Sequence, residues 1–409
     1  MREMKDSGVK WIGRIPQTWK TIRFKYLHDG LNTGEAIDKD YWSDSDNDRV
    51  FYTAGLVPIR TDYTDFPEWK YTTSDDILLA RNGTPYVYFP LEGACYTDHI
   101  IRASMKKGIC KKFVQYSLQH SIASVVVETV SIPTWSASLW NEQEIPWPDC
   151  IEQIKIADFL DKKCLQVDTL ISNVQTQIEK LKAYKQSLIT EVVTKSLDPT
   201  VPMKDSGVEW IGEIPEKWDV SMLSSLFSHR KCKNDGMQNN NLLSLSYGNI
   251  IEKSINTCDG LLPASFEGYN IIVPGCIVLR LTDLQNDHTS LRVGHCNEKG
   301  IITSAYVTIE LRNKLDQSRY FYYAIHSFDV KKGFYGMGSG VRQGLTFDGV
   351  KKLLLPVPSR TEQAKIVDYL DEKCAQIDRL IAIKEQKIEK LDQYKKSLIY
   401  EYVTGKREV

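Results

Sequence analysis

The sequence lacks several features that mark common classes of protein. Its nine cysteines are scattered and form no C-x-x-C pair, so neither a zinc site nor a disulfide framework is indicated. No apolar run approaches the roughly 18 residues that a membrane-spanning helix needs, and no signal peptide is recognisable. We therefore expect a protein of the reducing cytoplasm.

Sequence motifs of common enzymes are also missing. There is no G-x-x-x-x-G-K-[ST] loop for nucleotide hydrolysis and no G-x-S-x-G elbow. FYGMG at 334–338 matches the F-x-G-x-G loop of adenosylmethionine-dependent methyltransferases, but it comes late in the chain, and no Asn/Asp-Pro-Pro-aromatic motif accompanies it. We expect no catalytic residue, metal or cofactor in this chain; a standalone methyltransferase is kept as an alternative.

An excess of one charge is lacking as well. The 52 Lys and Arg residues balance 53 Asp and Glu residues, for a formal net charge of −1. This balance argues against a protein that binds nucleic acid over its whole surface. It leaves room for a local basic face, because counterion release depends on the contact surface and not on total charge.

Glycine and proline are absent from two stretches, 152–194 and 362–404. Each can form one uninterrupted helix of about 43 residues. Apolar residues recur with a four-three spacing that is typical of coiled coils. Lys185 interrupts this pattern in the first stretch, and Lys395 interrupts it at the equivalent position of the second. The seam positions are Leu160, Cys164, Val167, Ile171, Val174, Ile178, Leu181, Leu188 and Val192 in the first stretch, and Leu370, Cys374, Ile377, Ile381, Lys384, Ile388, Leu391, Leu398 and Tyr402 in the second.

A narrow apolar seam flanked by charges needs a partner helix, and the other stretch is the nearest candidate. We predict that the two helices pair antiparallel, because an internal repeat favours two-fold pseudo-symmetry. This pairing would place residues 1–19 near the C-terminus. A parallel pairing, with body two returning the chain, is the alternative.

The chain contains an internal repeat. MKDSGVKWIGRIPQTW at 4–19 returns as MKDSGVEWIGEIPEKW at 203–218, with twelve of sixteen positions identical. The segments that follow, body one (20–145) and body two (219–355), diverge. We predict an α+β fold with a pseudo-two-fold repeat in four parts: a domain at 1–148, a long helix at 149–197, a domain at 198–358 and a long helix at 359–409.

The bodies combine short strands with short helices. Apolar runs bounded by Gly, Pro, Asn and Asp predict strands at 76–80, 124–127, 271–273, 276–279 and 306–309. Short helices are predicted at 111–121 and 318–327. Proline-spaced connectors, 145–148 and 355–358, then precede the long helices.

Two unlike bodies on a duplicated frame suggest one task performed on two targets. Duplex DNA suits such a molecule, because half-sites must lie at a set distance and angle. A coiled-coil scaffold that carries two unlike protein- or glycan-binding modules is the alternative.

Candidate DNA-binding residues follow predicted strands or surround a glycine-rich loop, and their side chains offer donors and acceptors for base edges or cations for phosphates. Each could equally be part of a solvated polar loop. In body one they are Arg81, Asn82, Thr84, Tyr86 and Arg102, with Lys106, Lys107, Lys111 and Lys112 nearby. In body two they are Arg280, Thr282, Asp283, Asn286, Arg292, Lys331, Lys332, Arg342 and Gln343.

The combination of motifs resembles the specificity subunit of Type I restriction-modification enzymes over nearly the whole chain. The residues that carry this resemblance are KDSGVKWIG at 5–13 with its copy at 204–212, Glu152-Gln153 and Glu362-Gln363 after their prolines, LLSLSYGN at 242–249, RLTD at 280–283 and GVRQG at 340–344.

The resemblance implies two target recognition domains, each reading one half of a split DNA sequence, on two spacer helices that form an antiparallel coiled coil. It further implies two methylation subunits, which transfer a methyl group from adenosylmethionine to adenine, and two ATP-dependent restriction subunits, which a methylation-only system would lack. Body one departs from the pattern, because SIPTW at 131–135 replaces GSGVR at 338–342.

Overall fold

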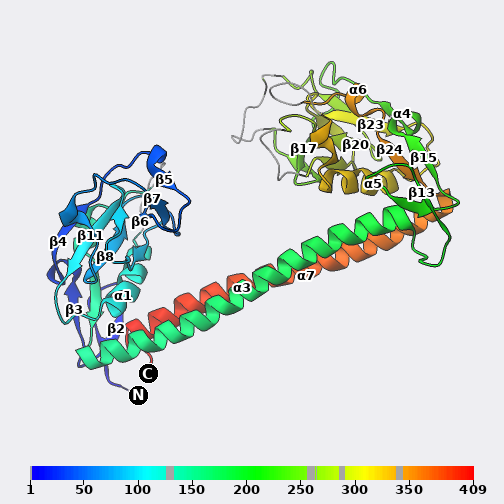
Figure 1. Cartoon of the computed structure of the whole chain (residues 1–409). Coiled ribbons are helices and arrows are strands. Elements are labelled where there is room, and N and C mark those ends of the chain that lie inside the picture. Colours follow the sequence, from blue (N-terminus) through cyan, green and yellow to red (C-terminus); the bar gives the residue numbers. More distant parts are fainter. Residues whose placement is uncertain (1, 126–132, 256–262, 264, 285–290, 338–343) are drawn as a thin grey trace. The chain divides into compact units, whose positions relative to one another are not determined.

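The computed structural model describes residues 2–125, 133–255, 263, 265–284, 291–337 and 344–409. It divides into two compact units: unit 1 combines Met1–Gln175 with Gln386–Val409, and unit 2 is Thr176–Glu385. The long helices α3 (Cys150–Lys195) and α7 (Arg360–Val403) contribute to both units (Figure 1). Each unit is therefore one body with one half of each helix.

Body one is built from two four-stranded sheets. One sheet has the order β4-β11-β8-β9 and is antiparallel throughout; the other has the order β10-β6-β7-β5, in which β10 and β6 run parallel. The strands are β4 (His28–Thr33), β5 (Trp42–Ser43), β6 (Arg49–Tyr52), β7 (Ile59–Thr61), β8 (Asp76–Ala80), β9 (Val87–Tyr88), β10 (Cys95–Tyr96) and β11 (Ile100–Met105).

Strand β8 is continuously apolar because both of its faces are buried. Ile77 and Leu79 belong to one apolar cluster, and Leu78 and Ala80 belong to a second. Helix α1 (Lys111–Ala123) covers the first cluster. Smaller elements complete the body: η1 (Phe24–Tyr26), η2 (Lys39–Tyr41), η3 (Glu68–Lys70), α2 (Ala137–Asn141) and the pair of β3 (Lys20–Arg23) with β12 (Glu144–Trp147).

Body two has a similar plan, with one antiparallel and one mixed four-stranded sheet, but the parallel pair is central in its mixed sheet and lies at the edge in that of body one. Its sheets have the orders β16-β23-β20-β21 and β18-β17-β22-β19. The elements are β15 (Asp219–Met222), α4 (Leu223–Leu226), β16 (Phe227–His229), β17 (Leu242–Ser246), β18 (Asn249–Lys253), β19 (Asn270–Ile272), β20 (Ile277–Leu279), β21 (Val293–His295), β22 (Gly300–Ile302), β23 (Val307–Leu311), α5 (Ser318–Val330), η4 (Gly333–Gly336), α6 (Phe347–Val350) and β24 (Leu354–Val357), which pairs with β15.

The repeated motif makes the same contacts in each unit. In unit 1 it forms the hairpin of β1 (Met4–Asp6) and β2 (Arg14–Pro16), and the buried Trp19 indole donates to Glu152 Oε2 at 2.7 Å. In unit 2 it forms β13 (Met203–Asp205) and β14 (Glu213–Pro215), and the Trp218 indole donates to Glu362 Oε1 at 3.1 Å. The identical sequence is thus explained by its attachment to the start of a long helix.

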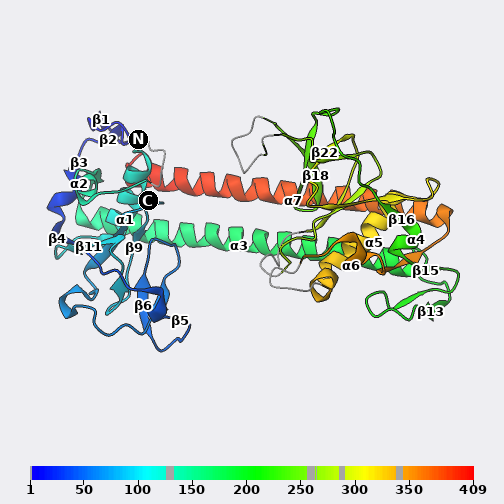
Figure 2. The same ribbon diagram turned by 90° about the horizontal axis from the view of Figure 1, so that it is seen from above.

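Within each unit, the segments of α3 and α7 lie side by side and run in opposite directions (Figures 1 and 2). In unit 1 the ring of Phe159 packs 4.5 Å from that of Tyr402, and Lys395 Nζ lies 2.6 Å from Asp168. In unit 2 Lys384 Nζ donates to Gln177 at 2.6 Å, and Lys185 Nζ lies 2.6 Å from Asp378. The lysines that interrupt each seam therefore pair with an aspartate on the other helix.

The two chain ends meet in unit 1, as the antiparallel arrangement predicts. Lys406 Nζ donates to the main-chain oxygen of Ile12 at 2.8 Å. Ile12 and Trp19 share an apolar cluster with Leu398 and Tyr402. The expectation that residues 1–19 lie near the C-terminus is confirmed.

Most local predictions are confirmed. The predicted strands at 76–80, 271–273, 276–279 and 306–309 correspond to β8, β19, β20 and β23, and the predicted short helices to α1 and α5. The strand predicted at 124–127 is wrong at its start, because Ser124 is the C-cap of α1; residues 126 and 127 lie outside the described residues. No helix in the described ranges is long and apolar enough to cross a membrane.

Candidate nucleic-acid interface

The candidate interface of body one lies where β8 ends. The Arg81 amide donates to His99 O at 2.8 Å, and the Trp135 amide donates to Arg81 O at 2.6 Å. Asn82 pairs with Thr134 in an antiparallel bridge. Three segments therefore form one surface, which we call the body-one edge: residues 81–86, 97–99 and 133–135.

Four of the five candidates from body one lie on this edge. The side chains of Arg81 and Thr84 are exposed, and those of Asn82 and Tyr86 are half-buried. Asn82 Nδ2 lies 2.7 Å from His99 Nδ1. Guanidinium, amide and hydroxyl groups are the side chains that read base edges and contact phosphates, so the edge has suitable chemistry.

Helix α1 and a buried tryptophan hold the backbone of the edge in place. Gln119 Oε1 accepts from the Val87 amide at 2.9 Å, and its Nε2 donates to Pro85 O at 2.8 Å. The Trp135 indole donates to Gly83 O at 2.7 Å. A recognition surface needs such support, because a loose loop loses binding free energy when it becomes ordered.

Several residues of the edge were not identified from the sequence, among them Asp98, His99 and Thr134. Asp98 and His99 stand directly before the apolar start of β11, which is a weak signal of a strand-end loop. Thr134 is joined to Asn82 only through the tertiary fold, and nothing in the local sequence indicates this.

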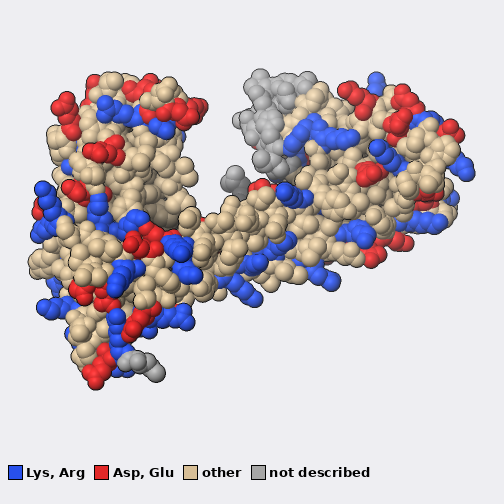
Figure 3. All heavy atoms as spheres, turned by 60° about the horizontal axis from the view of Figure 1, so that its bottom comes forward, with Lys and Arg blue, Asp and Glu red and all other residues tan. Residues whose placement is uncertain are grey.

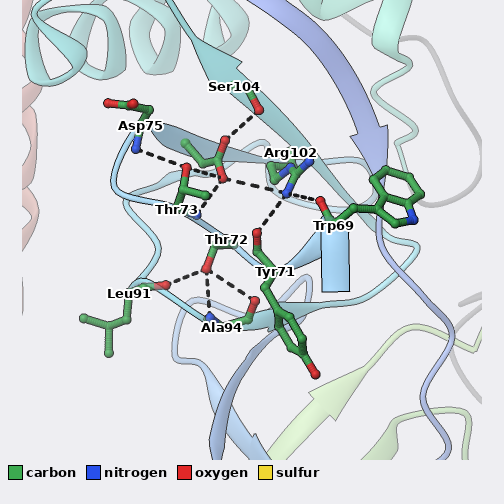
Figure 4. A network of polar contacts seen from close by, with 10 residues as sticks. Trp69, Tyr71, Thr72, Thr73, Asp75, Leu91, Ala94, Arg102 and Ser104 are labelled. Carbon is green, nitrogen blue, oxygen red and sulfur yellow. Dashed lines mark hydrogen bonds and ion pairs between the residues drawn. The ribbon is translucent and has the colours of Figure 1, made fainter. Parts of the chain in front are cut away.

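The prediction for Arg102 is corrected by the structure. Only 7% of this residue is exposed, and its Nη1 donates to Tyr71 O at 2.9 Å and Trp69 O at 3.1 Å. Nη1 also lies 3.9 Å from the buried Asp76 carboxylate, which accepts from Ser104 Oγ at 2.8 Å (Figure 4). Arg102 therefore stabilises the interior of body one and is not displayed to a ligand.

The nearby lysines lie at the other end of β11. Lys106 and Lys107 follow its last residue, whereas His99 precedes its first. Lys106 Nζ donates to Tyr26 O at 3.0 Å, and Lys112 pairs with Asp161 of α3. These lysines do not join the body-one edge.

The candidate interface of body two lies where β20 ends. The Arg280 amide donates to Arg292 O at 2.8 Å, and the Leu345 amide donates to Leu281 O at 2.8 Å. The half-buried side chains of Arg280, Thr282 and Asp283 belong to this surface. We call it the body-two edge, which comprises residues 280–284 and 344–346.

The prediction that Arg292 reads bases is also corrected. The residue is fully buried. Its Nη1 donates to Thr282 O at 2.8 Å and to Arg280 O at 3.1 Å, and its Nη2 donates to Asp283 O at 3.3 Å. Arg292 therefore clamps the main chain of the body-two edge from the inside.

Two candidates of body two have left-handed backbone conformations, Asp283 with φ of 56° and Lys332 with φ of 61°. Such conformations are costly for residues other than glycine and are enriched at functional sites. Lys331 Nζ donates to Trp210 O at 2.9 Å, so its ammonium group supports the frame. Three further candidates, Asn286, Arg342 and Gln343, lie outside the described residues.

The two edges occupy equivalent positions. In the central strands, Leu79 pairs with Ile101 and Leu279 pairs with Val307. Two residues after Leu79, the main-chain oxygen of Arg81 accepts a hydrogen bond from the Trp135 amide. Two residues after Leu279, the main-chain oxygen of Leu281 accepts one from the Leu345 amide. At this equivalent position body one has the exposed Arg81 and the half-buried Asn82, whereas body two has the buried Leu281 and the half-buried Thr282.

Burial governs the titration of the aromatic groups near these surfaces. Burial, and to a smaller extent the neighbouring Tyr86, raises the pKa of Tyr88 to about 12. Its hydroxyl therefore stays protonated and donates to Gly55 O at 3.1 Å. In unit 2, burial, and to a smaller extent the positive charge of Lys185, lowers the pKa of His326 to about 4. Both groups are therefore uncharged at neutral pH.

Charged side chains of both signs are interspersed over each unit on the face drawn in Figure 3. Among the described residues, no three His, Cys, Asp or Glu side chains lie close enough to hold a metal ion. The described part of the surface thus offers local hydrogen-bonding edges within a mixed electrostatic field.

Comparisons with known proteins agree with the resemblance in the sequence. A family model, the Type I restriction modification DNA specificity domain, matches residues 296–393. The Type I restriction enzyme MjaVIII specificity subunit of Methanocaldococcus jannaschii is 23% identical, over 96% of this chain and 94% of that protein. The putative MjaX specificity subunit of the same organism is 26% identical, over 97% and 95%.

The fold has a counterpart among solved structures. A chain from a structure concerned with complex assembly and conformational transition of the type I R-M system superposes with a TM-score of 0.66 at 12% identity, and the match covers 95% of this chain and 98% of that chain. At this identity the likeness concerns the fold. The family model and the two relatives thus show that the chain is similar to the specificity subunits of Type I restriction-modification enzymes, and its fold is mixed α/β.

Proposed function

We propose that this chain reads DNA sequence for a Type I restriction-modification complex and catalyses no reaction itself. Body one reads one part of an asymmetric, bipartite site, and body two reads the other. One observation supports two unlike readers: on the same main-chain arrangement, the strand end of body one carries the exposed Arg81 and the half-buried Asn82, and that of body two carries the buried Leu281 and the half-buried Thr282. A protein- or glycan-binding scaffold gains no support from the relatives.

The proposal includes the division of the chain into two target recognition domains, 1–148 and 198–358, and two spacer helices, 149–197 and 359–409. The helices form an antiparallel coiled coil over their length. The opposed contacts Lys395–Asp168 and Lys185–Asp378 support this arrangement within each unit.

The partners in this proposal are double-stranded DNA and the other subunits of the complex. Two methylation subunits supply adenosylmethionine-dependent methyl transfer to adenine, and two ATP-dependent restriction subunits join where the system also cuts DNA. The match to the family model and the names of the relatives support these partners.

The residues proposed to contact DNA are those on the two edges, the candidates outside the described residues, and Lys332, which lies on neither edge. In body one they are Arg81, Asn82, Thr84 and Tyr86. In body two they are Arg280, Thr282, Asp283, Asn286, Lys332, Arg342 and Gln343.

Mapping the methylated adenines in cells that carry the complete system tests the proposal. We expect a two-part motif with unlike halves separated by unread bases. A palindromic or continuous motif would contradict the assignment of two different readers. No sequence-dependent methylation at all would remove the proposed function.

Single substitutions assign each half of the motif to one body. Arg81→Ala should relax the first half only, and Arg280→Ala the second half only, because each lost base contact costs about 1–3 kcal/mol of discrimination. Lys107→Ala is a matched control, since this exposed cation lies at the opposite end of β11 from the body-one edge. Changes in both halves from one substitution would refute the separate assignment.

A further inference from the structure

The hairpin of β17 and β18 ends in a two-residue turn. Ser246 and Asn249 form its last pair, so Tyr247 and Gly248 make the turn. Both have positive φ, 46° for Tyr247 and 80° for Gly248. Two-residue turns of this kind favour Asn-Gly, because both positions require a left-handed backbone.

Gly248 suits its position, and Tyr247 does not. A Cβ atom at Gly248 would lie 3.1 Å from Leu291 Cβ, so a side chain there would be crowded. Tyr247 is a bulky L-residue in a conformation that such residues rarely adopt. The turn itself therefore gives no reason for a tyrosine.

Burial does not compensate for this conformation. Tyr247 is 80% exposed, more than any other Tyr, Trp or Phe side chain that the structure describes as exposed. Its main-chain oxygen accepts from Asn249 Nδ2 at 3.4 Å, a contact that does not involve the ring. An exposed ring in a strained backbone is a feature that folding does not explain, and such residues cluster at binding sites.

The hairpin borders a cleft of about 810 Å³ within unit 2. Its lining includes the half-buried Tyr322 of α5, the cations Lys182, Lys185 and Arg319, and the carboxylates of Asp371 and Asp378. Arg319 is held by Asp371 at 2.6 Å, whereas Lys182 of α3 is exposed. The exposed ring of Tyr247 and the exposed Lys182 border the same cleft, and such a combination suits nucleic acid, since rings pack on bases and sugars and cations attract phosphates.

We propose that Tyr247 contacts DNA directly, with its ring packed against a base or deoxyribose of the half-site that body two reads. This inference rests on the proposed function and adds a residue that neither edge includes. The rigid two-residue turn presents the ring without loop motion, so contact incurs little ordering entropy. The hydroxyl group is not required for this contact.

The substitution Tyr247→Asn separates the contact from the fold. Asn suits the first position of this turn, so the variant should melt about 2–4 °C higher. The same variant should bind the cognate duplex roughly 5- to 150-fold more weakly, which is the usual range for losing one aromatic contact with a base. Higher stability with weaker binding is the opposite of damage to the structure.

Two further variants serve as controls. Tyr247→Phe keeps the ring and should bind within about twofold of the unchanged protein, a difference much smaller than one aromatic contact provides. Met237→Asn removes the backbone strain at another left-handed residue of unit 2, which has φ of 55°. It should leave the affinity for DNA unchanged. All variants are assembled with their methylation subunits before the affinity for a duplex bearing the mapped motif is measured.

The outcomes distinguish the inference from the function beneath it. Unchanged affinity in Tyr247→Asn, or an equal loss in Tyr247→Phe, would overturn the ring contact. Loss of subunit assembly in Tyr247→Asn would instead assign the ring to a protein partner and also overturn it. If the unchanged complex shows no sequence-specific binding, the proposed function itself fails.

Discussion

Replacing Arg292 with methionine should destabilise unit 2 and disturb the body-two edge. The guanidinium donates to three main-chain oxygens and, from Nε, to the Tyr335 hydroxyl at 3.2 Å. Methionine fills part of the space but leaves these buried acceptors without donors. Hydrogen bonds from a charged donor contribute about 1.5–3 kcal/mol each and are not additive, so we expect a loss of about 3–5 kcal/mol in the free energy of unfolding.

Thermal unfolding of the whole chain measures this loss. For a domain of the size of Thr176–Glu385, each kcal/mol lowers the melting temperature by about 2–4 °C, so the transition of unit 2 should fall by roughly 6–20 °C. Arg292→Lys retains the charge but not the planar set of donors, so its melting temperature should lie between those of the unchanged protein and Arg292→Met. Lys253→Met is the control, because this cation of unit 2 is exposed, and it should change the unfolding free energy by less than about 0.5 kcal/mol.

The methylation motif of the assembled complex provides the second measurement. Arg292→Met should reduce discrimination at several positions of one half-site together, because the whole edge loses its support. If this variant keeps the melting temperature and changes a single base preference, Arg292 reads DNA directly and the clamp is refuted.

Three other predictions concern buried groups. Arg102→Met should destabilise unit 1 and weaken the first half-site only, since Arg102 joins the carbonyls of Trp69 and Tyr71; unchanged melting would contradict this. Trp19→Phe removes the donor to Glu152 and should lower the free energy of unfolding by about 1–3 kcal/mol. Urea unfolding measures this change, and an unchanged midpoint would show that the hydrogen bond does not stabilise the fold. The folded pKa of His326, about 4, lies below its unfolded value of about 6.5. The unfolded state therefore binds the proton first, and stability should fall by about 3 kcal/mol between pH 6.5 and 4. In His326→Gln this component should vanish, and parallel pH profiles of the two proteins would disprove it.

The sequence predicts the frame of the molecule well because the frame depends on local patterns. A four-three seam without glycine or proline specifies a long helix, and the structure has helices of 46 and 44 residues. The reason for Lys185 and Lys395 could not be predicted. Their partners, Asp378 and Asp168, are about 200 residues away and meet them only after the helices pair.

The candidate interface was predicted less well because burial of a polar residue is a tertiary property. Arg81 follows β8 and Arg102 lies within the neighbouring β11, yet the first is exposed and the second is buried and bonded to main-chain carbonyls. Arg292 shows the same limit in body two. Thr134 and His99 reach Asn82 through the fold, so no spacing along the chain indicates them.

The meeting of the chain ends in unit 1 affects the order of folding during synthesis. The apolar cluster that contains Ile12 and Trp19 also requires Leu398, Tyr402 and Val403. The ribosome makes these three residues after the whole of unit 2, which is one continuous segment. Because domains fold as units while the chain emerges, unit 2 can complete its core first. The cluster around Ile12 and Trp19 can form only after the last helical turns have been synthesised.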